Sequence, residues 1–211
     1  MHLPWKRFLF VLVLVLLDQW SKSAVFEHLD PARVMHDAPE GYGLDIHGHR
    51  RWVLVDPYFS FMLSLNPGAA FGRFGDYPHL LIWGRVLAVL GLTWFAWKLP
   101  TRPWFMSIAV VLVLAGALGN LVDNFWTGPM QDGHPYGLVR DFLDVWFVSA
   151  DSLDASGEAS GWGWDYHFPT FNVADSCITV GAILWILGSF LFGDPLAKPK
   201  EGNGNPTEET A

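Results

Sequence analysis

Four long apolar runs are the feature that most constrains what this chain can fold into. They lie at about residues 5–27, 79–97, 104–123 and 173–192. Each is close to the ~20 residues that an α-helix needs to cross the hydrocarbon core of a bilayer. Within the first run, Lys6 and Arg7 precede the apolar stretch from Phe8 to Leu17, as in a signal peptide, but no small-residue cleavage site follows it, so we expect a retained span. The pattern predicts an all-α membrane protein, a four-transmembrane-helix bundle.

Composition supports a membrane protein and excludes several other classes. Only 16 % of the residues are charged, whereas soluble domains usually have about 25 %. The net charge is −8 with 13 Lys and Arg in total, which argues against a nucleic-acid partner. A single cysteine, Cys177, excludes an intramolecular disulfide and a zinc site built on several thiolates. We expect neither a metal nor a cofactor.

The distribution of lysine and arginine predicts the orientation of the spans. Basic residues near span ends favour the cytoplasmic side, and six of them fall on one side if both termini are cytoplasmic. These are Lys6, Arg7, Lys98, Arg102, Lys198 and Lys200. The long loops 28–78 and 124–172 then lie outside the cytoplasm.

The outer loops are predicted to carry a small extracytoplasmic β-structure. Residues 52–55 and 58–65 read as two short strands separated by a turn at Asp56. The apolar segment 138–148 is expected to lie along the membrane interface. Residues 1–198 are predicted to form one integral membrane domain, and the Pro-, Gly- and Glu-rich residues 199–211 a disordered cytoplasmic tail.

Polar residues within the spans are costly in a bilayer, so each is a candidate functional residue. Asp18 and Lys22 are four residues apart and can pair on one helical face, either as a purely structural ion pair or as part of a site. Gly116, Asn120 and Asp123 share one face at the end of the third run. They indicate either a polar helix end or a site. Arg85 can extend toward water or meet a carboxylate.

Two more carboxylates follow in the second half of the chain. Asp175 lies in the first turn of the fourth run, where the helix dipole favours a carboxylate, and Asn172 can cap that helix. Asp141 and Asp144 interrupt the apolar segment 138–148.

The available chemistry is therefore that of carboxylates at one membrane depth. The chain has no His-Glu-x-x-His and no Gly-x-Ser-x-Gly motif, and Cys177 at the start of an apolar helix is best explained by packing. Two neighbouring carboxylates share one proton. The ionised one can activate water as a general base, and the protonated one can polarise a carbonyl and protonate a leaving amine. A proton or ion pathway would use the same residues, and a scaffold without chemistry is a third reading.

Five motifs in order carry a resemblance to a known family. They are Asp18-Gln19-x-Ser21-Lys22, Asn66-Pro67-Gly68-Ala69-Ala70-Phe71-Gly72, Gly116-x-x-Gly119-Asn120-x-x-Asp123, Val139-x-Asp141-Phe142-x-Asp144 and Phe171-Asn172-x-Ala174-Asp175. Together with the four spans, they resemble lipoprotein signal peptidase (signal peptidase II), a family of bacterial inner-membrane aspartyl proteases.

The resemblance implies a function, a site and a location. It implies cleavage of diacylglyceryl-modified prolipoproteins just before the lipidated cysteine, by a catalytic pair at Asp141 and Asp175 and without a cofactor. The implied partners are these substrates and membrane lipids, the implied state is a monomer, and the implied site is at the periplasmic face. The supporting or substrate-contacting positions are Asp18, Lys22, Asn66, Gly68, Asn120, Asp123 and Asn172.

Two positions depart from the family pattern. Asn124 stands where the family usually has arginine, and Arg140 stands where it usually has valine. We hypothesise that Arg140 supplies the missing cation from a different backbone position. The alternatives are a diverged paralogue without peptidase activity and a small proton-linked transporter. A transporter would have acids near the midplane and internal repeats, whereas here the acids gather at one interface and no repeat is visible.

Overall fold

The structure is a computed structural model. It describes residues 5–30, 40–44, 50–56, 58–67, 77–99, 104–131, 133–148 and 165–192. Its long helices are α1 (Trp5–His28), α3 (Pro78–Lys98), α4 (Trp104–Val122) and α5 (Val173–Phe192). A π-helical turn, η2 (Asp123–Thr127), continues α4. In this part of the chain, four helices are long and apolar enough to cross a membrane, and the predicted spans agree with them closely.

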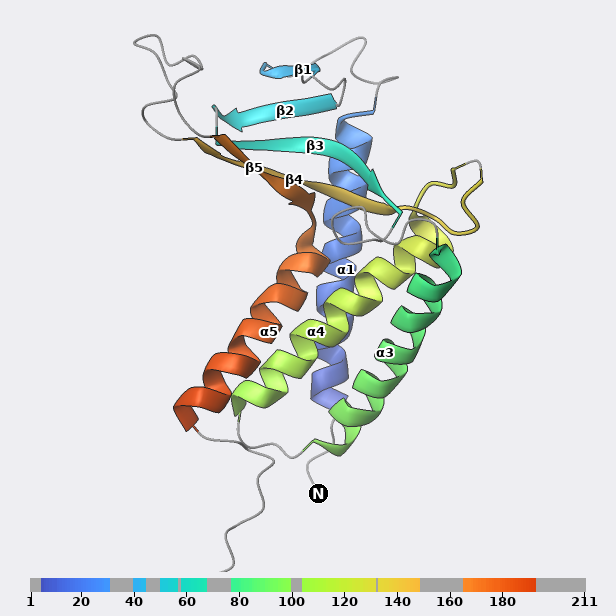
Figure 1. The fold of residues 1–211 in the computed structure, drawn as a ribbon, viewed down its shortest axis with the longest axis vertical. Coiled ribbons are helices and arrows are strands. Elements are labelled where there is room, and N and C mark those ends of the chain that lie inside the picture. Colours follow the sequence, from blue (N-terminus) through green and yellow to red (C-terminus); the bar gives the residue numbers. More distant parts are fainter. Residues whose placement is uncertain are drawn as a thin grey trace, which may run out of the picture.

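A five-stranded antiparallel sheet lies across one end of the helices (Figure 1). Its strands are β1 (Tyr42–Leu44), β2 (Arg50–Val55), β3 (Phe59–Asn66), β4 (Val139–Val148) and β5 (Asp165–Phe171), in that spatial order. The two strands predicted at 52–55 and 58–65 are confirmed as β2 and β3. The four apolar helices and the small β-structure are as predicted, but the fold is not purely all-α, because the sheet forms a second layer over the bundle.

The segment 138–148, predicted to lie along the membrane interface, contains β4, a strand inside the sheet. β4 pairs with β3 through partners such as Ser64 and Asp141, and with β5 through partners such as Trp146 and His167. Its residues from Val139 to Phe142 are all buried. A strand that is buried on both faces shows no strict alternation of polar and apolar residues, which is why the sequence pattern did not reveal it.

Helix α4 is the centre of the bundle. It carries more of the buried apolar side chains than any other described helix, whereas α1, α3 and α5 turn large apolar side chains outward, as a bilayer would accommodate. Gly116 allows α4 and α5 to touch, because a Cβ at this position would lie 2.2 Å from the carbonyl oxygen of Ala174. This close approach brings the polar end of α4 against the start of α5. The predicted tail at 199–211 lies outside the described residues.

Candidate active site

The first carboxylate of the site, Asp141, is presented by β4 and is 1 % exposed. Both of its oxygens accept hydrogen bonds from asparagines. Asn66 Nδ2 donates to Oδ2 at 3.0 Å, and Asn172 Nδ2 donates to Oδ1 at 2.6 Å. Asn66 comes from the end of β3 and Asn172 from the turn between β5 and α5, so three chain segments fix the orientation of this carboxylate.

The second carboxylate, Asp175, lies in the first turn of α5. Asn172 caps this helix as predicted, because its Oδ1 accepts a hydrogen bond from the backbone N–H of Asp175 at 2.9 Å. Asn120 Nδ2, from α4, donates to Asp175 Oδ1 at 2.7 Å. Asn172 Nδ2 also donates to Asn120 Oδ1 at 3.1 Å. The two asparagines therefore link Asp141 to Asp175 in one hydrogen-bonded chain.

The environment of Asp141 favours its protonated form. Burial raises the pKa of this carboxyl from 3.8 to about 7, and the negative charge of Asp175 adds to the rise. The hydrogen bonds from Asn66 and Asn172 and the charge of Lys22 oppose it but are smaller. Near neutral pH, Asp141 can therefore either hold or release a proton, which is what a general acid or base requires.

A buried ion network lies on the helical side of the two carboxylates. Lys22 Nζ lies 2.8 Å from Asp18 Oδ2 and 3.1 Å from Asp123 Oδ2, so the predicted pair of Asp18 and Lys22 is present. Lys22 also donates to Asn120 Oδ1 at 3.0 Å. Asp18 Oδ1 accepts the backbone N–H of Ala174 at 2.9 Å. The network thus connects α1 and α4 to the first turn of α5, which carries the second carboxylate.

Arg140 is the second cation of this network. Its Nη2 lies 2.8 Å from Asp123 Oδ1, and its backbone N–H donates to Asp123 Oδ2 at 3.0 Å. Nη2 also donates to Gln19 Oε1 at 3.0 Å, and Nη1 donates to Ser23 Oγ at 3.1 Å. Arg140 therefore places a positive charge on Asp123 from β4. That Arg140 replaces the missing arginine stays a hypothesis, which a variant at this position can test.

Asn124, the other departure from the family pattern, is paired with Arg85. Arg85 Nη1 donates to Asn124 Oδ1 at 2.7 Å, and Asn124 Nδ2 donates to the carbonyl of Gly137 at 2.8 Å. The positive charge of Arg85 acts on Asp175, Asp141 and Asp123. Arg85 is thus held by Asn124, near enough to these carboxylates for its charge to act on them.

Sequence reasoning gave no role to two further members of the network, Gln19 and Thr127. Gln19 Nε2 donates to Asp18 Oδ2 at 3.1 Å and to the carbonyl of Gly119 at 2.9 Å. Thr127 Oγ1 lies 2.8 Å from both Gln19 Oε1 and Asp123 Oδ1. Position 127 follows Asp123 by four residues, a spacing that could have revealed this contact.

The described part of the chain thus gathers nine of the ten candidate site residues into one polar cluster. They are Asp18, Lys22, Asn66, Asn120, Asp123, Arg140, Asp141, Asn172 and Asp175. The tenth, Gly68, lies outside the described residues.

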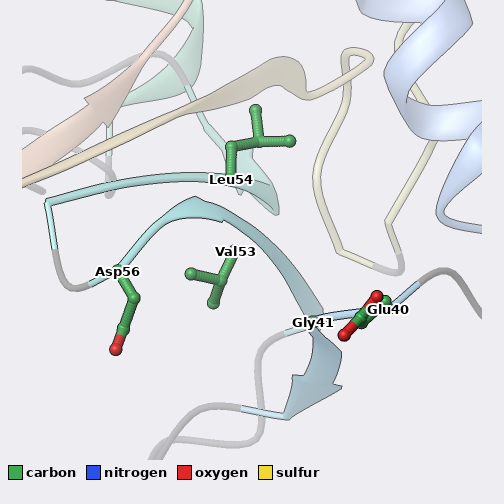
Figure 2. A pocket seen from close by; sticks show the side chains of 5 residues that line it. All are labelled: Glu40, Gly41, Val53, Leu54 and Asp56. Atoms are coloured by element: carbon green, nitrogen blue, oxygen red, sulfur yellow. The ribbon is translucent and has the colours of Figure 1, made fainter.

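A shallow pocket of about 520 Å³ lies elsewhere, at the edge of the sheet (Figure 2). It is lined by Glu40, Gly41, Val53, Leu54 and Asp56. Strand β3 separates this edge from β4, and none of the lining residues takes part in the polar cluster, so we do not assign the pocket to the site.

Residues 10–191 match the family described as signal peptidase (SPase) II. The chain belongs to this family. A lipoprotein signal peptidase of Shewanella loihica is 33 % identical over 89 % of this chain and 90 % of the relative. One from Shewanella sediminis is 31 % identical over 95 % of this chain and 94 % of the relative. One from Teredinibacter turnerae is 32 % identical over 89 % of this chain and 88 % of the relative.

Solved structures agree with the family assignment. Two that are described as bacterial membrane enzymes share the fold. The first has a TM-score of 0.58 at 23 % identity and covers 92 % of this chain and 93 % of that one. The second has a TM-score of 0.53 at 26 % identity and covers 87 % and 91 %. Family membership and four apolar helices make this chain a bacterial membrane protein of the signal peptidase II family.

Proposed function

We propose that this protein is an aspartyl endopeptidase that removes signal peptides from diacylglyceryl-modified prolipoproteins, cutting just before the lipidated cysteine. The observation that carries the proposal is the hydrogen-bonded chain from Asp141 through Asn172 and Asn120 to Asp175. The pKa of Asp141, about 7, supports acid–base chemistry by this hydrogen-bonded pair of aspartates. Membership in the signal peptidase II family and the names of the relatives support the substrate class.

In the proposed mechanism, the two aspartates share one proton. Asp141, whose pKa is raised, is the protonated member and Asp175 the ionised one. Asp175 takes a proton from a water molecule, whose oxygen attacks the scissile carbonyl carbon, while Asp141 donates a hydrogen bond to the carbonyl oxygen. The C–N bond then breaks as the leaving amine receives a proton from the pair.

The other polar residues position this pair. Asn66 and Asn172 hold Asp141, and Asn120 holds Asp175. The ions Asp18, Lys22, Asp123 and Arg140 fix the helices and β4 relative to each other. Gly68, by its place in the family motif, is proposed to contact the substrate backbone.

The membrane setting supplies part of the catalytic positioning. The diacylglyceryl chains of the substrate would remain in the bilayer, so the scissile peptide is held at the depth where the helices meet the sheet. Because the anchored substrate moves in only two dimensions and at a fixed depth, aligning it with the enzyme costs much less entropy. We further propose an inner-membrane location with both termini in the cytoplasm, the site at the periplasmic face, a monomer in contact with membrane lipids, and a single domain spanning 1–198.

The deciding experiment is a gel-shift cleavage assay with purified protein in detergent or lipid and a diacylglyceryl-modified prolipoprotein. Asp141→Asn and Asp175→Asn should each abolish cleavage. Asp56→Asn, which removes an exposed carboxylate from the turn after β2, should cleave as the unmodified protein does. Cleavage that persists in both site variants would contradict the aspartyl mechanism. Absence of cleavage by the unmodified chain, while another family member cuts in parallel, would favour a diverged paralogue or a proton-linked transporter.

A further inference from the structure

A second buried carboxylate, Asp144, lies three residues beyond Asp141 on β4 and is 1 % exposed. The fully buried Ser60, on β3, donates a short hydrogen bond to Asp144 Oδ2. His167, on β5, places Nε2 at 2.5 Å from Asp144 Oδ1. Trp146 Nε1 lies 3.3 Å from Oδ2, and its ring stacks on His167 with centroids 4.4 Å apart. One carboxylate therefore joins three adjacent strands.

The backbone around Asp144 is irregular on both sides. Ser60 pairs with Asp144 and Ser64 with Asp141, so β3 advances four residues while β4 advances three. Toward β5, Leu143 pairs with Phe171 and Val145 with Phe168, so β5 advances three residues while β4 advances two. Asp141 and Asp144 thus lie on opposite sides of the first irregularity, and Asp144 lies within the second.

These irregularities make the position of Asp141 depend on local register. A slip of one residue moves a strand side chain to the opposite face of the sheet, and a β-bulge is the place where such a slip can be absorbed. Pro169 lies in the β5 irregularity and has no backbone N–H to bind the neighbouring strand. Side-chain hydrogen bonds to Asp144 therefore help to hold the strand register where backbone hydrogen bonds between the strands are missing.

We propose that Asp144, held by Ser60 and His167, is a positioning residue that fixes the register of β4 against the bulged strands β3 and β5 and so keeps Asp141 directed toward Asp175. The inference rests on the proposed function, because it assigns Asp144 a role in the same reaction. It acts through Asp141 and does not touch the substrate. Loss of either partner would leave the bulge in β3 or in β5 free to shift relative to β4. A displacement of about 1 Å at a reacting group can cost a factor of about 100 in rate.

The test compares Ser60→Ala, His167→Ala and His167→Gln with the unmodified protein. His79→Ala is the matched control, since it removes a histidine near the start of α3 whose hydrogen bond is to Tyr136, a residue outside the sheet. Three quantities are measured: kcat and KM for prolipoprotein cleavage, and the midpoint at which the Asp141 carboxyl titrates by difference infrared spectroscopy. The Asp141→Asn variant assigns the infrared band.

We expect Ser60→Ala and His167→Ala to lower kcat at least about tenfold with KM changed less than about twofold, because the lipid anchoring of the substrate is untouched. His167→Gln should recover most of kcat, since its amide can still donate to Asp144. The Asp141 midpoint, about 7 in the unmodified protein, should fall in both alanine variants as the carboxyl moves away from its buried site.

Three results would overturn the inference. One is kcat within about twofold of the unmodified value in both alanine variants. Another is a fall in kcat that is equal in His167→Ala and His167→Gln and that matches the fall in the fraction of folded protein. The third is an unchanged Asp141 midpoint in both alanine variants. The titration requires no cleavage, so an unmodified chain that cuts nothing would refute the proposed function while the midpoint still decides the role of Asp144.

Discussion

Replacing Asp141 by asparagine should stabilise the folded protein increasingly, relative to the unmodified chain, as pH rises from about 5 to about 8. The pKa of this carboxyl is raised from 3.8 to about 7 on folding, chiefly by burial and then by the charge of Asp175. Between those two values, the folded state keeps a proton that the unfolded state has released. The free energy of unfolding therefore falls as pH rises through this window.

The magnitude follows from the size of the pKa difference. A difference of about 3 corresponds to about 4 kcal/mol once the group is fully ionised. About 1.5 kcal/mol of this is already present at pH 5, so the remaining change between pH 5 and pH 8 is about 2.5 kcal/mol. Asparagine at this position has one acceptor oxygen for the two donors Asn66 and Asn172. That mismatch costs about 1–3 kcal/mol at every pH and leaves the pH dependence unaffected.

The measurement is reversible unfolding in mixed detergent micelles titrated with sodium dodecyl sulfate, followed by circular dichroism at several pH values. Asp56→Asn is the control, because it removes a carboxylate that is exposed in the turn after β2. We expect the stability difference for Asp141→Asn to rise steadily with pH and that for Asp56→Asn to stay flat. A difference for Asp141→Asn that is constant between pH 5 and pH 8 would refute the reasoning that burial raises this pKa.

Three further predictions concern activity and packing. Arg140→Ala should lower the free energy of unfolding by about 3–5 kcal/mol and abolish cleavage, since it leaves the buried Asp123 without this cation; unchanged cleavage would exclude our hypothesis for the missing arginine. Gly116→Ala should lower the free energy of unfolding by about 1–3 kcal/mol or more, since its Cβ would meet a backbone carbonyl of α5. Gly91→Ala, whose Cβ would have nothing within 4 Å, should be neutral or stabilising. Equal denaturation midpoints for the two variants would contradict this. The rate of cleavage should fall as pH rises past about 7, because Asp141 then loses its proton, and a pH–rate profile without this alkaline limb would count against Asp141 as the acid.

The helices and their polar residues could be predicted because the information is local. A run of about 20 apolar residues indicates a span wherever it occurs, and Asp18 and Lys22 are one helical turn apart, so their pairing follows from spacing. The cap at Asn172 follows for the same reason. Strands β2 and β3 are marked by the turn between them, which begins at Asp56.

The strand pairing of the sheet and the contacts at the centre of the site could not be predicted, because they depend on partners far apart in the chain. Ser60 and Asp144 are 84 positions apart, and Asn120 and Asn172 are 52 apart. The apolar residues of β4 fit a buried strand and an interfacial segment equally well until the neighbouring strands are known. Arg140 illustrates the same limit. The sequence suggested that Arg140 supplies a cation, but only the folded structure shows that its guanidinium contacts Asp123.

The site joins two parts of the chain that are made at different times. Asp141 is carried by the sheet, whereas Asp175 lies on α5, which follows every other described element in the sequence. A growing chain that has produced β4 therefore holds only one carboxylate of the proposed pair, and the chain from Asn120 to Asp175 cannot close until α5 packs against α4. The proposed peptidase would thus stay inert, however early its sheet forms, until α5 has been made and has inserted beside α4.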